Sequence, residues 1–181
     1  QRRGAGRLIF LADPDTPASF RDFLARWGVT VAPGYIRDLD RSVPGNPNTI
    51  RLQVYNPVAP AEIIRPRGTP LGITFMAGAA SLGLTDDGLR NPVPLAITSP
   101  NSYLIKDIDR TEPITDAGDR SDLKGAFSPV IYMQALGPVG APRPTAQPSA
   151  SDLASLVVFG DSDFLTNNAI NRGSGGDFFL N

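Results

Sequence analysis

The sequence predicts a single α/β domain with a mixed sheet, and three observations lead to this fold class. The chain has 181 residues, 41% of them hydrophobic, with nine Phe, four Tyr and one Trp, which is enough for one buried core. Apolar runs typical of strands alternate with an amphipathic helical pattern and with half-exposed strands. The eighteen Pro residues divide the chain into short elements joined by well-defined loops.

The first two elements are expected to be a strand and a helix. Residues 6–13 (GRLIFLAD) form a continuous apolar run, which predicts a strand buried on both faces. Residues 15–28 predict a helix with Thr16 as N-cap, Pro17 in the first helical position and Gly28 as its stop. Its apolar face is expected to pack on the sheet through Phe20, Phe23, Leu24 and Trp27.

The rest of the chain predicts further short strands and two notable loops. Residues 41–49 are rich in Pro, Gly and Asn and predict a loop. Residues 137–151 hold four Pro and two Gly and predict an exposed, extended loop within the one domain, which spans 1–181. Pro129 limits the first half of its strand to a sheet edge or a bulge. The expected strands are 29–40, 50–56, 70–82, 92–99, 126–136 and 153–161, followed by a helical or turn segment.

Composition argues against several functional classes. The net charge is −1 and no run of Lys or Arg exceeds two residues, so no nucleic-acid or polybasic membrane surface is expected. The chain lacks His, the usual general base and commonest metal ligand, and lacks Cys, which removes thiol chemistry and ordinary zinc sites. We expect no cofactor and no metal. The chain begins at Gln1 and ends on an apolar run, which suggests an excised piece of a longer membrane protein whose first strands are missing.

One stretch resembles a catalytic motif. Residues 157–168 (VVFGDSDFLTNN) place Ser162 after an apolar strand, and Phe-Gly-Asp-Ser is similar to the opening motif of the GDSL lipases and esterases. A Ser hydroxyl needs a base to act as nucleophile, and the chain has no His. The lysines, Lys106 and Lys124, stand in polar, loop-like sequence. We therefore expect no catalytic residue, and interpret Ser162 as part of a turn.

The same region holds weak candidates for ligand binding. Asp161 and Asp163 could bind a cation with help from Asp13 or Asp15, although their spacing is a weak signal and a capping turn is the favoured interpretation. Asp13, Ser99 and Asp161 each stand at the carboxyl end of an expected strand, so a cleft at these strand ends could bind a solute. Both ideas require Asp13 and Asp161 to end neighbouring strands at one edge of the sheet.

An ordered set of segments resembles a known family over most of the chain. GRLIFLADPD, FLARWGVTV and GYIRDLD come first, followed by PLAITSPNSYL (94–104), DLKGAFSPVIYMQA (122–135), LVVFGDSDFLTNNAI (156–170) and GGDFFLN (175–181). In this order they resemble the extracytoplasmic domain of the auxiliary components of ABC-type transport systems, the gliding-motility GldG-like family. One departure is Lys124-Gly125-Ala126, where the family has Lys-Gly-Pro.

The resemblance implies a Rossmann-like three-layer domain, similar to glutamine amidotransferase domains, with a mixed, mainly parallel sheet. It also implies a place on the extracytoplasmic face of the cytoplasmic membrane, with an ABC permease and ATPase as partners through the full-length membrane protein. It names no catalytic residues. The leading hypothesis is a non-catalytic auxiliary or binding domain of such a system. A small-solute or glycan-binding domain is the alternative, and a GDSL-like serine hydrolase is the remote one.

Overall fold

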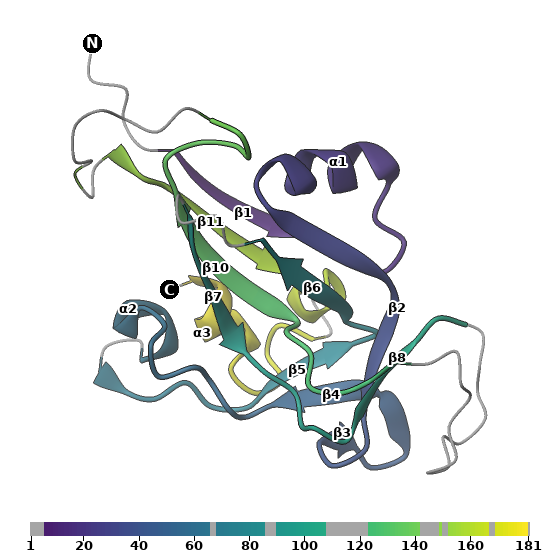
Figure 1. The fold of residues 1–181 in the computed structure, drawn as a ribbon. Helices are drawn as coiled ribbons and strands as arrows, with labels where there is room; N and C mark the ends of the chain where they lie inside the picture. The colour runs from purple at the N-terminus through teal and green to yellow at the C-terminus, as the bar shows by residue number, and fades with distance from the viewer. Residues whose placement is uncertain are drawn as a thin grey trace.

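The computed structural model describes residues 6–65, 68–85, 90–107, 123–141, 149, 152–166 and 169–180, drawn as a ribbon in Figure 1. In chain order the elements are β1 (Arg7–Leu11), α1 (Ala18–Arg26), β2 (Val29–Asp38), β3 (Ser42–Val43), β4 (Asn46–Leu52), α2 (Ala61–Ile64), β5 (Thr74–Ala77), β6 (Ala80–Leu84), β7 (Arg90–Ala96), β8 (Ser102–Ile105), β9 (Leu123–Lys124), β10 (Val130–Ala135), β11 (Ala154–Phe159), the 3₁₀ turn η3 (Asp163–Leu165) and α3 (Gly175–Leu180).

The strands form three sheets. The first sheet has the order β1-β11-β10-β7, the second β6-β2-β8-β9 and the third β3-β4-β5. Strands β1 and β11 run parallel, with Ile9 opposite Val157, whereas β10 runs antiparallel to both β11 and β7. Neighbouring strands of the other two sheets pair antiparallel. The first sheet carries the candidate site at one end.

The predicted Rossmann-like, three-layer fold with a mainly parallel sheet is wrong. A parallel pair needs a long crossover connection, usually a helix, between its strands. Here the described helices are short, with nine residues in α1, four in α2 and six in α3. Tight reversals at Gly45 and Gly78, both with positive φ, join β3 to β4 and β5 to β6 instead. The chain therefore builds three antiparallel or mixed sheets.

Two apolar cores lie on opposite faces of the first sheet. Alternating residues of β10 and β11 divide between them: Ile131 and Val158 join one core with Leu24 of α1, and Val130 and Phe159 join the other. Figure 1 shows α1 beside β1 and β2 on one side, with α2 and α3 on the other. Both faces of the central strands are thus covered.

The first strand and helix form where the sequence predicts, with different surroundings. Strand β1 is an edge strand rather than one buried on both faces, and Leu8 and Ile9 are 40% and 48% exposed. Helix α1 begins one residue later than predicted, with Pro17 in the N-cap position. Of the predicted apolar face of α1, Leu24 is fully buried and Trp27 is half-buried, but Phe20 remains 51% exposed.

Several other segments have strand and loop boundaries that differ from the prediction. Residues 41–49, predicted as a loop, contain β3 and the start of β4. Residues 70–82, predicted as one strand, contribute to both β5 and β6, in different sheets. At Pro129 the prediction is confirmed in part, because β10 begins after it and the pairing with β7 shifts register between Val130 and Ile131. Most of the predicted loop 137–151 lies outside the described residues.

Candidate functional site

The strand ends that carry Asp13 and Asp161 lie side by side, as the site hypothesis requires. Asp13 follows β1 and Asp161 follows β11, and these strands are parallel neighbours. The backbone N–H of Ser162 donates a hydrogen bond of 2.9 Å to Oδ1 of Asp13. The Asp13 carboxylate therefore links the two strand ends. Thr16, predicted as the N-cap of α1, closes the loop after Asp13. Its hydroxyl accepts a hydrogen bond from the backbone N–H of Asp13 and donates one to the Asp13 carbonyl.

The Asp161 carboxylate is buried and joins two parts of the chain. Its Oδ1 accepts a 2.8 Å hydrogen bond from the backbone N–H of Asp163, and its Oδ2 accepts a 2.7 Å bond from the N–H of Ala77 at the end of β5. Burial, together with the nearby charges of Asp13 and Asp163, raises the pKa of Asp161 to about 7, against the opposing effect of these two hydrogen bonds. This carboxyl group tethers the turn to the third sheet.

Gly160 permits the close approach on which the turn depends. Its carbonyl accepts a hydrogen bond of 2.6 Å from the N–H of Ala80, and its N–H donates one of 2.8 Å to the carbonyl of Pro129. A Cβ at this position would collide with the carbonyl oxygen of Ala80. The Gly-Asp pair of the motif is therefore explained by contacts between strands.

Ser162 has the surroundings of a turn residue. Its backbone makes two hydrogen bonds: the N–H donates to Asp13 and the carbonyl accepts from Leu165 at 3.3 Å. The lysines that could replace a missing His are Lys106, which follows β8, and Lys124 in β9. The ammonium of Lys124 lies 5.3 Å from the centre of the Tyr103 ring, in a sheet different from that of β11. The favoured interpretation of the motif is structural.

Replacing Ser162 by alanine is expected to change the free energy of unfolding by less than about 0.5 kcal/mol, because the backbone hydrogen bonds of the turn are kept. Urea unfolding of the two proteins measures this difference. The variant should also hydrolyse p-nitrophenyl acetate at the same rate as the parent protein. Ester turnover by the parent that disappears in the variant would restore the hydrolase hypothesis.

Ser99 does not join Asp13 and Asp161. Its hydroxyl donates a 2.6 Å hydrogen bond to Oδ1 of Asp38, and its N–H donates a 2.8 Å bond to Oδ2 of the same carboxylate. Asp38 is 1% exposed and also accepts bonds from the N–H groups of Asp40 and Arg41. Strand β10 lies between β7, which precedes Ser99, and β11. Asp38 is the last residue of β2 and lies inside the predicted strand 29–40, so the strand pattern did not mark it as a turn residue.

The hollow at the strand ends does not hold a metal-binding arrangement. An open hollow of about 400 Å³ is lined by Asp13, Asp15, Ser162 and Asp163 together with Pro14, Tyr35, Ala77 and Gly78. Over the described ranges, no group of three acidic side chains is placed to share an ion. The Asp161 carboxylate is occupied by backbone N–H groups and does not line this hollow. The cation hypothesis for Asp161 and Asp163 gains no support from this geometry.

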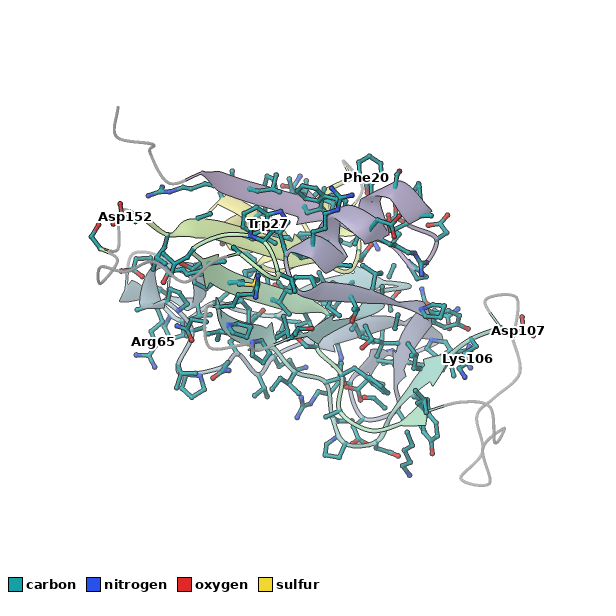
Figure 2. The ribbon with its side chains drawn as sticks, turned by 45° about the horizontal axis from the view of Figure 1, so that its top comes forward. Phe20, Trp27, Arg65, Lys106, Asp107 and Asp152 are labelled. Carbon is teal, nitrogen blue, oxygen red and sulfur yellow. The ribbon has the colours of Figure 1, made fainter. Side chains whose placement is uncertain are left out.

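A surface on strand β1 and helix α1 that was predicted to be buried is partly exposed. Leu8 of β1 and Phe20 of α1 are partly exposed on one face of the first sheet, where the Phe20 ring lies 5.6 Å from that of Phe10, and Ile9 is partly exposed on the other face. Figure 2 shows Phe20 and Trp27 on the same side of the molecule. The apolar run had indicated burial, and nothing in its residue types indicated that one edge would stay open. Among the described helices, none has the length and apolar character needed to cross a membrane.

The comparisons with known proteins give a likeness of fold. No family model matches the chain, and no curated protein matches it. Among solved structures, the chain is similar to one described as the mmIFT52 N-terminal domain, with a TM-score of 0.56 and 10% sequence identity. The match covers 97% of this chain and 62% of that chain, so this chain spans less than two thirds of its length. At this identity the likeness concerns the arrangement of the backbone alone.

Proposed function

We propose that this chain is a non-catalytic auxiliary domain of an ABC-type membrane transport system, on the extracytoplasmic face of the cytoplasmic membrane. In this proposal it acts by binding proteins, and its partners are the ABC permease and ATPase, reached through the full-length membrane protein. Substrate chemistry belongs to those subunits.

The observation that carries the proposal is the position of the segments that resemble the auxiliary-component family. They contribute residues to all four strands of the first sheet: GRLIFLADPD contains β1, PLAITSPNSYL overlaps β7, DLKGAFSPVIYMQA contains β10 and LVVFGDSDFLTNNAI contains most of β11. Segments that are far apart in the sequence thus belong to one unit of structure. Their shared place in one sheet supports the proposal, although that sheet is not the mainly parallel one that the resemblance implies.

The chemistry of the Gly-Asp-Ser-Asp turn also favours a non-catalytic role. Two carboxylates near the motif serine accept hydrogen bonds from backbone N–H groups, Asp13 from Ser162 and Asp161 from Ala77 and Asp163. A carboxylate used in this way orders the turn. The sequence has no His, so the motif serine lacks the base that usually activates such a nucleophile.

Co-purification tests the proposal. The full-length membrane protein, carrying an affinity tag and extracted in mild detergent, is expected to retain the ABC permease and ATPase, identified by mass spectrometry. The Ser162→Ala variant is the matched control and should retain both subunits equally, because the proposal assigns no chemistry to this hydroxyl. A folded, abundant protein that retains neither subunit would contradict the proposal.

A further inference from the structure

The outer edge of β1 presents backbone groups that β11 does not use. The carbonyl of Gly6 accepts a 2.9 Å hydrogen bond from the N–H of Ser155, and the N–H of Ala12 donates a 2.7 Å bond to the carbonyl of Phe159. Because backbone groups alternate in direction along a strand, the even-numbered residues face β11 and the odd-numbered ones face outward. The outward groups belong to Arg7, Ile9 and Leu11. Within the described part of the chain, no strand pairs with this edge.

Three apolar side chains, on the two faces of the sheet, are exposed beside this edge together with the charged Arg7. Leu8 and Ile9 are 40% and 48% exposed, and Phe20 of the neighbouring helix is 51% exposed. Single exposed apolar residues are normal, but several beside a strand edge that no described strand covers indicate a binding surface. Natural edge strands usually carry charges, prolines or bulges that discourage pairing. Strand β1 carries one charge, Arg7 at its first residue, and none of these features between Leu8 and Leu11.

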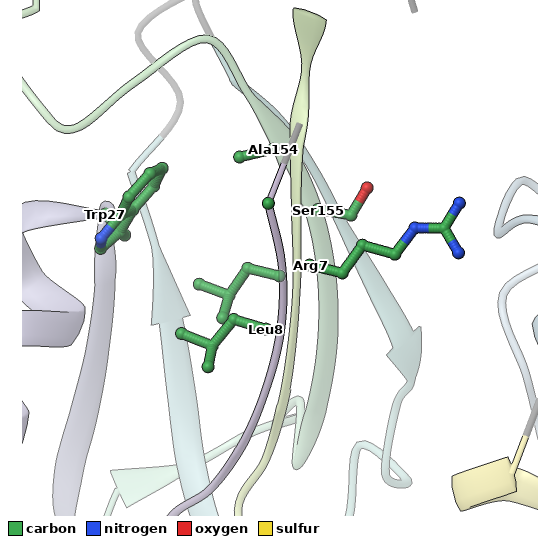
Figure 3. Close-up of a pocket in the computed structure, with 7 residues that line it drawn as sticks. Arg7, Leu8, Trp27, Ala154 and Ser155 are labelled. Carbon is green, nitrogen blue, oxygen red and sulfur yellow. The ribbon is translucent and has the colours of Figure 1, made fainter. Parts of the chain in front are cut away.

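Two hollows flank β1, one on each face of the sheet. The first, of about 130 Å³, is lined by Leu8, Trp27 and Leu156 among others. Figure 3 shows Trp27 facing Leu8 across this hollow, while Arg7 and Ser155 point to the opposite side. On that side lies a larger, mostly apolar groove of about 470 Å³, bordered by Ile9 and the α3 residues Phe178, Phe179 and Leu180.

We propose that the outer edge of β1 binds an extended, apolar β-strand of a partner protein. This inference rests on the proposed function, since it names the surface through which the domain would bind its partner. Main-chain hydrogen bonds to Arg7, Ile9 and Leu11 supply affinity. Successive side chains of the added strand point to alternate faces, so they enter the small hollow beside Trp27 and the large groove beside α3 in turn.

The partner strand is apolar on both faces and carries an acidic residue near Arg7. A second copy of this chain is a poorer occupant. Two β1 strands paired antiparallel about Ile9 would place the guanidinium of Arg7 beside the apolar Leu11 of the other copy. An acidic residue on a different segment satisfies Arg7 and still leaves apolar side chains for both hollows.

The probe for this surface is a synthetic peptide of alternating valine and isoleucine with aspartate at one end, which is apolar on both faces. We expect it to slow amide hydrogen exchange about tenfold or more at Arg7, Ile9 and Leu11, measured by NMR. The amides of Leu8 and Phe10 face β11 and should change much less. A peptide with proline at every second position cannot donate a row of hydrogen bonds and should protect none of them.

Ile9→Lys places a charge between the edge and the groove and should abolish the protection. Leu123→Lys is the matched control, because Leu123 is 56% exposed on β9, in another sheet. Ile9→Thr, a smaller change, replaces Ile9→Lys if the lysine variant does not fold. Three results would overturn the inference: no protection of the outward amides, equal protection in the Ile9 variant, or protection that appears without peptide as the chain dimerises.

The co-purification experiment separates this inference from the proposed function. If Ile9→Lys loses the peptide but the full-length variant still retains the permease and ATPase at the parent level, the edge is not the partner surface and the proposed function stands. If the parent binds the peptide through the outward amides but retains neither subunit, the proposed function is wrong and the strand-binding edge stands.

Discussion

Replacing Phe159 by alanine is expected to lower the free energy of unfolding by about 3–5 kcal/mol. Phe159 is 2% exposed and is the last residue of β11. Its ring centre lies 4.9 Å from that of Phe164 and 5.3 Å from that of Phe178. Removing it leaves a cavity between η3, α3 and the sheet, and these short elements cannot close it without losing their own contacts. Urea unfolding followed by tryptophan fluorescence measures the change.

Phe20→Ala is the matched control for Phe159→Ala. Phe20 of α1 is 51% exposed, and its ring centre lies 5.6 Å from that of Phe10 in β1. We expect a loss below about 1 kcal/mol, from one aromatic pair and a half-buried surface. Equal losses in the two variants would show that the cluster around Phe159 does not hold the end of β11 in place.

The positions of most strands could be predicted from the sequence, but their partners could not. The apolar run of β11 and the half-exposed pattern around Ile50 identify strands because side-chain periodicity is a local property. Which strands pair depends on the reversals between them. Gly78 has a φ of 69° and turns the chain from β5 into β6, which lies in a different sheet. A glycine can stand in a turn or inside a strand, and the side-chain periodicity on either side of Gly78 does not distinguish these two possibilities.

For the candidate site too, part of the arrangement could be predicted from the sequence and part depended on strand order. The proximity of Asp13 and Asp161 could be predicted from the sequence, because each stands at the end of an apolar strand and neighbouring parallel strands end at one edge. Ser99 also follows a strand, yet β10 lies between β7 and β11 and Ser99 bonds to Asp38 instead. The order of strands in a sheet decided this outcome, and residue types at strand ends carry no information about it.

Strand β1 shows a third kind of difference. Its residues are those of a strand buried on both faces, and they fold into a strand, but Ile9 remains 48% exposed. Residues that are apolar on both faces are most stable in a strand that is buried on both faces. The described part of the chain supplies β11 on one side of it and leaves the other side open. This mismatch between composition and environment is what indicates a further strand.

The second large effect is expected at Asp161, where asparagine should lower the free energy of unfolding by about 1–3 kcal/mol at mildly acidic pH. The two side-chain oxygens accept bonds from the N–H groups of Ala77 and Asp163, and in the protonated acid the hydroxyl oxygen can still accept one of them with its own proton turned away. An asparagine has the same shape but only one acceptor oxygen, so its amide group must face one of these donors. Asp22→Asn, at an exposed position of α1, is the control and should change stability by less than about 0.5 kcal/mol.

This loss should depend on pH in one direction. Burial raises the pKa of Asp161 from its ordinary value of 3.8 to about 7. The folded protein therefore binds more protons than the unfolded chain between these two values, and the contribution of Asp161 to stability falls as the pH rises through this window. Asparagine does not titrate, so the deficit of the variant should shrink by about 2–3 kcal/mol between about pH 5 and about pH 8. Unfolding curves of both proteins at a series of pH values measure it. A deficit that stays constant or grows with pH would mean that the two N–H donors outweigh burial and hold Asp161 ionised, which would make the turn an electrostatic clamp instead of a buried acid.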